Sequence, residues 1–289
     1  MILDGEVTAR KIKTELARRV ARLSEKGVTP GLTAIRVGAD AASELYVSRK
    51  MKSCEEVGIH SHSVVMDDKT SEAELLDMIA KENADPKTSG ILVQLPLPAG
   101  INTQAVIEAI DPSKDVDGFH PFNVGRVTTG VGGFASCTPK GIVRLLDEFG
   151  IDCKGKDTVI VGASKIVGKP LAGLMLTRMA TITVCHIETK DLAAHTRRAE
   201  ILVVGVGRPG LVTKEMVTRG VVVVDVGINR VPDSGSPRGF RVVGDVAASV
   251  KEVAYAWTPV PGGIGPMTVA MLMENTVIAA EAALTGEVV

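Results

Sequence analysis

The sequence predicts an α/β protein that includes a doubly wound parallel sheet covered by helices. Hydrophobic residues make up 45% of the 289 residues but aromatic residues only 3%, a composition that suits buried parallel strands. Short β-branched runs alternate with segments of helical periodicity along most of the chain. Because the length exceeds that of one ordinary domain, we expect two domains.

In the N-terminal part, helical and strand patterns alternate. We expect helices at 5–26, 42–57, 71–81 and 102–110, and strands at 32–37, 60–66 and 90–95. Ser71 followed by Glu74 forms a capping box, which marks the start of one helix. Residues 111–139 are irregular and rich in Gly, Pro and Asp, so we interpret them as a functional loop and domain junction.

The segment 156–176 organises the C-terminal part. A buried strand at 158–161 turns at Gly162 and leads into a helix with Pro170 at its start. Free N–H groups at such a helix N-terminus favour an anion, so we predict a turn that binds a nucleotide pyrophosphate. The spacing G-x5-G differs from G-x-G-x-x-G, and an ordinary turn of a doubly wound sheet is the alternative.

The same alternation continues to the end of the chain. A helix is expected before this segment at 140–149; after it we expect strands at 181–186, 200–207 and 221–229, short helices at 191–197 and 214–218, and an exposed hairpin turn at 233–239. A Gly/Pro loop at 258–266 precedes a helix that is apolar enough to be buried.

Charge and cysteine content exclude several classes of protein. The net charge of −1 comes with no basic block, so nucleic acid is not an expected partner. The N-terminus does not resemble a signal peptide, and we expect no membrane span of about 18–20 apolar residues. Four scattered cysteines without a C-x-x-C pair indicate reduced thiols, a cytoplasmic location and no metal site.

Tyr46 and Lys50 are spaced i, i+4 and therefore share one face of a predicted helix. A phenol beside an amine can position a substrate and transfer a proton, although such a pair also occurs on solvated helix faces. Short-chain dehydrogenases use this spacing after their nucleotide turn. Here the pair precedes the turn by more than a hundred residues, which disfavours that class.

Polar residues also follow the third predicted strand. Gln94 stands at its C-terminal end, where open α/β sheets bind ligands, and its amide could bind a heterocycle, an ammonium group or only loop backbone. Asp115 and Asp117 are either Asx-turn residues or include one carboxylate that binds an amino-pyrimidine. Their spacing does not choose between these roles. His120 is expected to be structural.

The loop at 258–266 contains three prolines and three glycines. Its backbone could approach a flat ligand closely, and a domain linker is the alternative. Asp225, Gly227 and Ile228 end a predicted strand, so their backbone could line a cofactor cleft.

Six stretches together resemble the bacterial FolD family, the bifunctional methylenetetrahydrofolate dehydrogenases/methenyltetrahydrofolate cyclohydrolases. They are SELYVSRK (43–50), GILVQLPLP (90–98), KDVDGFHP (114–121), VGASKIVGKP (161–170), VVVVDVGIN (221–229) and TPVPGGIGPMT (258–268). The resemblance implies oxidation of 5,10-methylenetetrahydrofolate to the 5,10-methenyl form with NADP. Hydrolysis to 10-formyltetrahydrofolate then follows, as a step of one-carbon metabolism.

The resemblance also implies a domain organisation. An N-terminal α/β catalytic domain (1–118) would bind folate, and a C-terminal Rossmann-type doubly wound parallel sheet (119–266) would bind the nucleotide, with a cleft between them. The C-terminal helix (267–289) would pack back on the first domain. A homodimer in the cytoplasm is implied as well.

Site roles follow from the matching residues. Lys50 would assist proton transfer in the cyclohydrolase step, Gln94 would hold Lys50 in a useful protonation state, Tyr46 would stack on or position the folate, and Asp117 would bind its pterin ring. The residues that would close over the substrate are Pro261, Gly262 and Gly263. Those that would bind the cofactor are Gly162, Ala163, Ser164, Gly168 and Ile228.

The choice of nucleotide is the open point. Many relatives have Arg where this chain has Ala163, and often Ser or Arg where it has Ile187 followed by Glu188. An acidic residue about 26 positions beyond Gly162 favours NAD, because it stands where a ribose 2′-OH ligand would. The habit of the family favours NADP, which we expect, with Lys165 and Lys190 as candidate phosphate partners.

Two alternative functions are considered. A two-domain dehydrogenase of the shikimate type has the same layout, but it lacks support from VQLPLP and PGGIGPMT. A nucleotide-binding protein without catalysis is opposed by intact Lys50, Gln94 and Asp117.

Overall fold

The computed structural model describes residues 1–287, apart from the side chains of Ala41 and Ala42, and the chain forms two compact units. Unit 1 comprises Met1–Ala9, Thr128–Gly130 and Thr138–Thr268. Unit 2 comprises Arg10–Val127, Val131–Cys137 and the chain from Val269 onward. Each unit contains its own parallel sheet, and we describe them separately.

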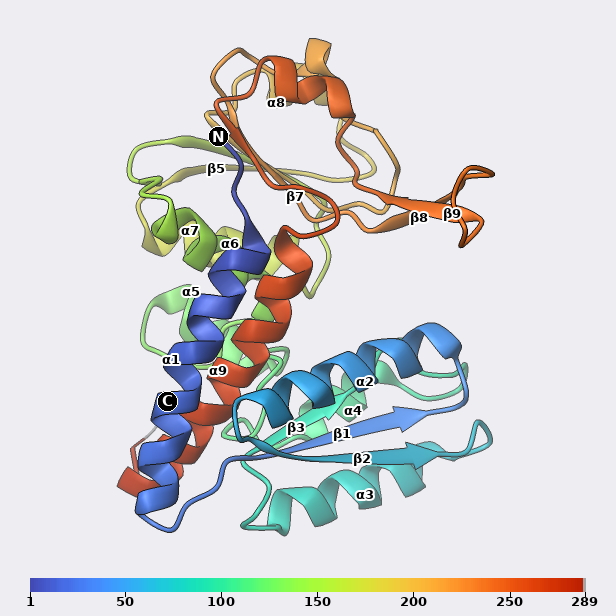
Figure 1. Ribbon diagram of the computed structural model, residues 1–289, viewed down its shortest axis with the longest axis vertical. Coiled ribbons are helices and arrows are strands. Elements are labelled where there is room, and N and C mark those ends of the chain that lie inside the picture. Colours follow the sequence, from blue (N-terminus) through green and yellow to red (C-terminus); the bar gives the residue numbers. More distant parts are fainter. Residues whose placement is uncertain (288–289) are drawn as a thin grey trace. The chain divides into compact units, whose positions relative to one another are not determined.

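Unit 2 contains a three-stranded parallel sheet of order β2-β1-β3 (Figure 1). The strands are β1 (Gly31–Val37), β2 (His60–Met66) and β3 (Gly90–Val93). The helices are α2 (Ala41–Glu56), α3 (Glu72–Ala84), α4 (Thr103–Ala109) and most of α1 (Gly5–Glu25), α5 (Pro121–Thr129) and α9 (Ile264–Thr285). Figure 1 shows α2 on one side of this sheet and α3 on the other.

Strand β1 is the centre of this sheet and is buried along its whole length. One of its faces, with Ile35 and Val37, packs against Leu75 and Ile79 of α3. The predicted capping box is confirmed, because the Ser71 side chain and the Glu74 side chain each bond the other residue's backbone N–H.

Unit 1 contains a five-stranded parallel sheet of order β10-β7-β6-β4-β5. Its strands are β4 (Asp157–Val161), β5 (Thr181–Cys185), β6 (Ile201–Val204), β7 (Val222–Asp225) and β10 (Ala256–Trp257). The helical segments are α6 (Cys137–Glu148), α7 (Gly168–Thr177), α8 (Leu192–Thr196) and the 3₁₀ turns η1 (Lys214–Met216) and η2 (Ala248–Glu252). The order confirms the predicted doubly wound parallel sheet.

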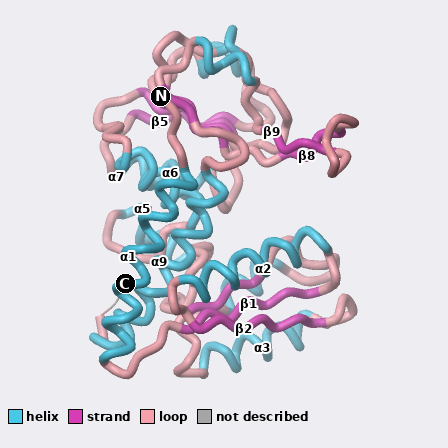
Figure 2. The backbone as a smooth tube through the Cα atoms, viewed as in Figure 1, coloured by secondary structure: helices cyan, strands magenta, loops and turns pink. Residues whose placement is uncertain are grey.

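Two additions complete unit 1. The first residues of the chain run parallel to β10, because Leu3 N donates to Trp257 O at 2.8 Å and Trp257 N donates to Met1 O at 3.0 Å. Strands β8 (Asn229–Pro232) and β9 (Phe240–Val243) form an antiparallel hairpin around the predicted turn. Figure 2 shows this hairpin projecting from the rest of unit 1.

Several predicted boundaries are wrong. The predicted strand at 221–229 ends at Asp225, and the helix at 214–218 is a single 3₁₀ turn. The stretch 111–139 contains α5, which the pattern missed because its exposed Phe122 and buried Asn123 invert the usual polarity. Asn123 is paired there, since its Nδ2 donates to Pro112 O and to the Asp115 carboxylate.

Helix α9 corrects the expectation that no segment is long and apolar enough for a membrane span. By length and composition α9 meets this criterion. Core helices share these properties, and 56% of its most apolar window is buried in the structure.

The buried amide of Asn275 on α9 provides a test of how unit 2 is held together. Its Nδ2 donates to Val116 O at 2.8 Å and to Ala135 O at 3.1 Å. We expect Asn275→Ala to lower the free energy of unfolding by about 2–3 kcal/mol, because both carbonyls lose a buried donor. Urea unfolding measures this. Thr285→Ala, at the exposed end of the same helix, is the control, and an equal effect of both changes would contradict the assignment.

Candidate functional site

Lys50 and Gln94 meet at the carboxyl-end edge of the unit 2 sheet. Lys50 Nζ donates to Gln94 Oε1 at 3.1 Å, and Gln94 Nε2 donates to Leu95 O at 2.6 Å. Because the amide N–H bonds the backbone, the amide oxygen is directed at the lysine. The Gln94 side chain therefore does more than bond its own loop.

The sheet and α2 fix both partners of this bond. Gln94 N donates to Ile35 O at 2.9 Å, which extends the β1–β3 ladder by one residue beyond Val93. Side chains alternate along a strand, so Gln94 lies on the face opposite to Val93, which packs with α3 residues. Helix α2, which carries Lys50, covers that opposite face (Figure 1). Asp40 caps α2 by accepting from Ser43 N at 2.7 Å.

Tyr46 lies one turn before Lys50 on α2, in the same continuous helix. Its side chain is 41% exposed, so its ring is available to contact a ligand. The i, i+4 spacing places both side chains on one helix face.

The structure separates the roles of the two neighbouring aspartates. Asp115 is 1% exposed, and its carboxylate accepts from Phe119 N at 3.1 Å, His120 N at 2.9 Å and Asn123 Nδ2 at 2.9 Å. Asp115 therefore organises its own loop. Within residues 1–287, no donor bonds the Asp117 carboxylate, which leaves it as the candidate ligand group.

His120 is likewise part of the loop, because its Nδ1 accepts from Phe122 N at 3.0 Å. This contact agrees with the structural role expected for it.

Burial dominates the electrostatics of Asp117. It raises the pKa of this carboxyl to about 6, while the charge of Lys50 lowers the pKa and that of Asp115 raises it. Asp117 also borders a shallow recess. The other lining residues are Asp115 and the apolar Val93, Leu95, Val106, Ile107, Ile110 and Phe119. The unbonded Asp117 carboxylate can accept hydrogen bonds from a ligand that carries N–H donors.

In unit 1, the switch point of the doubly wound order lies between β4 and β6. The turn after β4 touches the turn after β6, because a Cβ on Gly162 would lie 2.3 Å from Gly205 O. A Cβ on Gly168 would lie 1.8 Å from Gly162 O, and Gly162 has φ +119°. These two positions therefore require glycine.

The Ser164 side chain accepts hydrogen bonds from backbone N–H groups of the same turn. Its Oγ accepts from Val167 N at 3.1 Å and from Gly168 N at 3.5 Å, at the start of α7. Ala163 offers only a methyl group beside it. Pro170 lies in the first turn of α7, where its missing N–H costs no helix bond. This arrangement is suited to bind a nucleotide pyrophosphate through backbone N–H groups.

The remaining predicted residues also belong to unit 1. Ile228 is 52% exposed, and its Cδ1 lies 3.7 Å from a Cβ built on Gly265. Gly262 O accepts from Glu6 N at 3.0 Å, so the 258–266 loop is anchored to the first turn of α1. Pro261 is exposed on that loop, and Gly263 is buried. The Leu95–Pro96 and Val260–Pro261 peptide bonds are cis.

Asp245 is a residue that pattern reading missed. It is fully buried after β9, and its carboxylate bonds the turn after β6. The Gly-Asp pair that ends a short β-branched run was the available signal, but its partners lie about 40 residues earlier.

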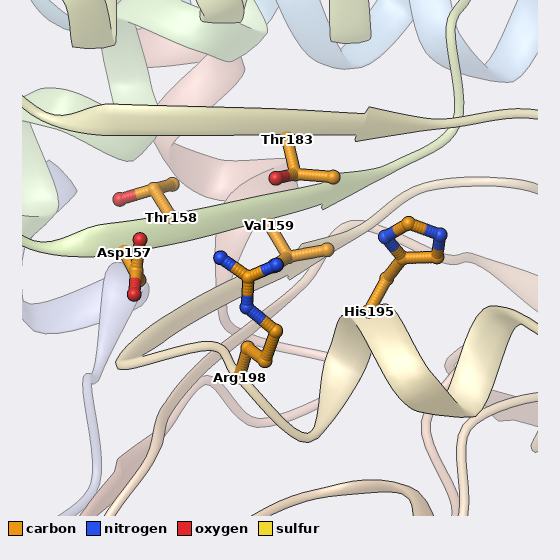
Figure 3. A pocket seen from close by; sticks show the side chains of 6 residues that line it. All are labelled: Asp157, Thr158, Val159, Thr183, His195 and Arg198. Atoms are coloured by element: carbon orange, nitrogen blue, oxygen red, sulfur yellow. The ribbon is translucent and has the colours of Figure 1, made fainter.

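A second, shallow recess lies in unit 1 (Figure 3). It is lined by Asp157, Thr158, Val159, Thr183, His195 and Arg198. Asp157 begins β4, and open α/β sheets bind ligands at the opposite, carboxyl ends of their strands. This recess contains no predicted site residue. Among residues 1–287, no cluster of His, Cys, Asp or Glu is arranged to hold a metal.

Comparisons with known proteins match both halves of the chain. Residues 3–117 match the family described as tetrahydrofolate dehydrogenase/cyclohydrolase, catalytic domain, and residues 136–284 match its NAD(P)-binding domain. The bifunctional protein FolD of Wolinella succinogenes is 54% identical over 282 residues, which cover 97% of this chain and 96% of the relative.

Solved structures agree with this match. The bifunctional FolD of Campylobacter jejuni has a TM-score of 0.94 at 47% identity, covering 97% of this chain and 98% of that one. The FolD of Trypanosoma brucei, solved with NADP cofactor and inhibitor, has a TM-score of 0.93 at 36% identity and covers 98% of each chain.

The raised pKa of Asp117 predicts that ionisation of this buried carboxyl lowers the stability of the folded protein at high pH. Its folded pKa of about 6 lies above the ordinary 3.8, so the folded protein holds this proton more tightly than the unfolded chain. The stability that protonation provides is complete below pH 4 and lost as pH rises through 6. We expect Asp117→Asn to raise the free energy of unfolding by about 1–2 kcal/mol at pH 8, discounted for partial exposure, and by nothing at pH 4.

Urea unfolding at the two pH values measures this difference. Asp111→Asn is the matched control, because hydrogen bonding from Ser113 lowers the pKa of Asp111 and its loss brings no gain at pH 8. Equal effects of Asp117→Asn at both pH values would refute the assignment.

Proposed function

Because the chain belongs to the tetrahydrofolate dehydrogenase/cyclohydrolase family, we propose that it oxidises 5,10-methylenetetrahydrofolate with NADP and hydrolyses the 5,10-methenyl product to 10-formyltetrahydrofolate. The observation that carries the proposal is the Lys50–Gln94 hydrogen bond in the unit that also holds the unbonded Asp117 carboxylate. The shikimate-type dehydrogenase and the nucleotide-binding protein without catalysis are not favoured, because the match spans both activities.

The oxidation asks for positioning more than for acid or base catalysis. The bridging methylene carbon loses two electrons and one hydrogen as its neighbouring nitrogen lone pair forms the cationic methenyl bridge. NADP, when bound, supplies the acceptor for this pair of electrons. The protein would hold the methylene carbon of the substrate and the nicotinamide ring of the cofactor in the orientation for transfer. Such positioning can account for much of the rate enhancement of a reaction between two bound molecules.

The nucleotide fits the turn after β4. A side chain at Gly162 would clash with Gly205 O and one at Gly168 with Gly162 O, so these glycines allow the close packing that shapes the turn. Backbone N–H groups of this turn would bind the pyrophosphate. Gly162, Ala163, Ser164 and Gly168 would hold that group. Ile228, half exposed after β7, would contact the cofactor through its apolar side chain.

The hydrolysis needs a proton carrier. Water adds to the cationic methenyl carbon and releases one of its two protons to solvent. The second proton passes to N5 as the bond between the carbon and N5 breaks and the formyl carbonyl forms on N10. Lys50 would move the proton between the water and N5. Gln94 would orient Lys50. Its amide N–H₂ donates to the Leu95 carbonyl, which leaves the amide oxygen facing the Lys50 ammonium.

Asp117 and Tyr46 would hold the folate. The pterin ring presents adjacent N–H donors, which a carboxylate accepts in pairs, and the Asp117 carboxylate has no donor of its own. Tyr46 would stack on or position the ring with its exposed side chain. Pro261, Gly262 and Gly263 would contact the substrate from the anchored loop.

The family relationship supports NADP as the nucleotide, and the Trypanosoma brucei relative was solved with it. Glu188, in the turn after β5, supports NAD as the alternative. The ratio of kcat/KM for NADP over NAD decides between them.

We further propose that residues 1–118 carry the folate site and 119–266 the nucleotide site. The C-terminal helix, expected at 267–289, would pack back on the folate domain; residues 288–289 of that range lie outside the described residues. We also propose a homodimer that works in the cytoplasm, without nucleic acid or membrane partners. Sedimentation of the purified chain tests the oligomeric state.

Turnover tests the proposed reaction directly. The protein, methylenetetrahydrofolate and either NADP or NAD should yield reduced nucleotide and then 10-formyltetrahydrofolate. An absence of reduced nucleotide with both cofactors would sink the dehydrogenase proposal.

Lys50→Met tests the hydrolytic step. We expect methenyl hydrolysis to fall at least about 100-fold, the scale of lost acid–base catalysis, with unchanged circular dichroism. Lys52→Met, an exposed lysine on the same helix, is the matched control and should keep wild-type hydrolysis. Hydrolysis that survives Lys50→Met would show that Lys50 is not the proton carrier.

A further inference from the structure

Two buried aspartates, Asp225 and Asp245, join three turns of unit 1. The Asp225 carboxylate accepts from Gly227 N and Asp245 N through Oδ1, both at 2.9 Å, and from Val246 N through Oδ2 at 2.9 Å. The Asp245 carboxylate accepts from Val206 N at 2.6 Å and Gly207 N at 2.8 Å through Oδ2. Its Oδ1 accepts from Asn229 Nδ2 at 2.8 Å.

These six bonds connect the turns that follow β6, β7 and β9. The contacts are close: a Cβ on Gly227 would lie 2.4 Å from the Asp245 Cγ, and one on Gly244 would lie 1.8 Å from the Asp225 Oδ2. Among the described residues, no Lys or Arg pairs with either carboxylate. The hydrogen bonds to the two carboxylates come from five backbone N–H groups and the side-chain amide of Asn229.

The turn after β6 also touches the turn we assign to the pyrophosphate. Gly205, whose carbonyl packs against Gly162, is followed directly by Val206 and Gly207, the two residues that Asp245 holds. The residues on either side of Ile228 are also held. Gly227, before it, donates its N–H to the Asp225 carboxylate, and Asn229, after it, donates its side-chain amide to the Asp245 carboxylate. The two carboxylates thus hold the backbone of turns that touch or include residues we assign to the nucleotide.

We propose that Asp245 is a positioning residue for the nicotinamide nucleotide, which holds the turns after β6 and β7 in the conformation that binds it. This inference rests on the proposed function. It makes nucleotide affinity depend on a residue that touches neither reactant. The hydrolytic step takes up no nucleotide, and Lys50, Gln94 and Asp117 belong to unit 2, so that step serves as an internal control.

The hydrogen-bond partners predict opposite outcomes for the same chemical change at the two aspartates. In Asp245→Asn, the amide oxygen can still accept from Val206 N and Gly207 N. The new N–H₂ can donate to the Asn229 side-chain oxygen once the Asn229 amide group rotates by about 180°. In Asp225→Asn, all three partners are backbone N–H groups, which cannot reverse. One of them must then face an N–H₂ group.

The experiment measures the Kd for NADP by calorimetry, and kcat and KM for both activities, in the full chain. We expect Asp245→Ala to raise the Kd and KM for NADP at least tenfold, with methenyl hydrolysis within twofold of wild type. Asp245→Asn should stay within threefold in all parameters, and Asp225→Asn should raise the Kd at least tenfold. An unchanged Kd in Asp245→Ala, or a parallel loss of hydrolysis, would overturn the proposal.

An exchange of the two side chains keeps the proposal falsifiable if Asp245→Ala does not fold. Asn229→Asp alone places two carboxylates against each other and should raise the Kd for NADP at least tenfold. Adding Asp245→Asn restores a donor to that contact and should return the Kd to within threefold of wild type. Failure of the double variant to recover would contradict the assignment.

Failure of the proposed function is distinguishable from failure of this inference. A wild-type chain that binds NADP but does not turn over methylenetetrahydrofolate would refute the function and leave the affinity test intact. A wild-type chain that turns over substrate, with Asp245→Ala showing wild-type Kd, would refute only the inference.

Discussion

The hydrogen bond from Lys50 to Gln94 is the interaction on which the account depends. It exists because two separate features of unit 2 place its partners: the β1–β3 ladder extends to Gln94 N, and α2 lies over the face onto which Gln94 projects. The bond from Gln94 to Leu95 O then fixes which amide atom meets the lysine. A lysine oriented in this way by a neutral amide oxygen suits the proposed role of Lys50 as a proton carrier.

The candidate sites of the two units are built by different physical means. In unit 2 the candidate groups are side chains, and burial sets the chemistry of Asp117 by raising its pKa to about 6. In unit 1 the proposed nucleotide site is made of backbone: glycines allow turns to touch, and buried carboxylates accept hydrogen bonds from backbone N–H groups of those turns. Substitutions at Lys50 or Gln94 should therefore act on chemistry, whereas those at Asp245 should act on nucleotide affinity.

Local pattern predicted much of this fold. The strands 32–37 and 60–66, the capping box at Ser71 and the glycine turn at Gly162 are all read from neighbouring residues, and the structure contains them. Residue spacing did not choose between Asp115 and Asp117, and only the family resemblance pointed to Asp117, because Asn123, which pairs with Asp115, lies on a helix that the pattern did not show. Asp245 was missed for the same reason, since its donors come from turns far earlier in the chain. Roles set by distant partners leave no periodic signal in sequence.

The most direct test of the central claim uses Gln94→Ala and follows reduced nucleotide and the methenyl form in one time course. If Gln94 orients Lys50 for hydrolysis, nucleotide reduction continues and the methenyl form accumulates in step with it, because only its removal is slowed. If the methenyl form instead disappears at the wild-type rate while nucleotide reduction is normal, the Lys50–Gln94 bond does not serve hydrolysis and the account is wrong.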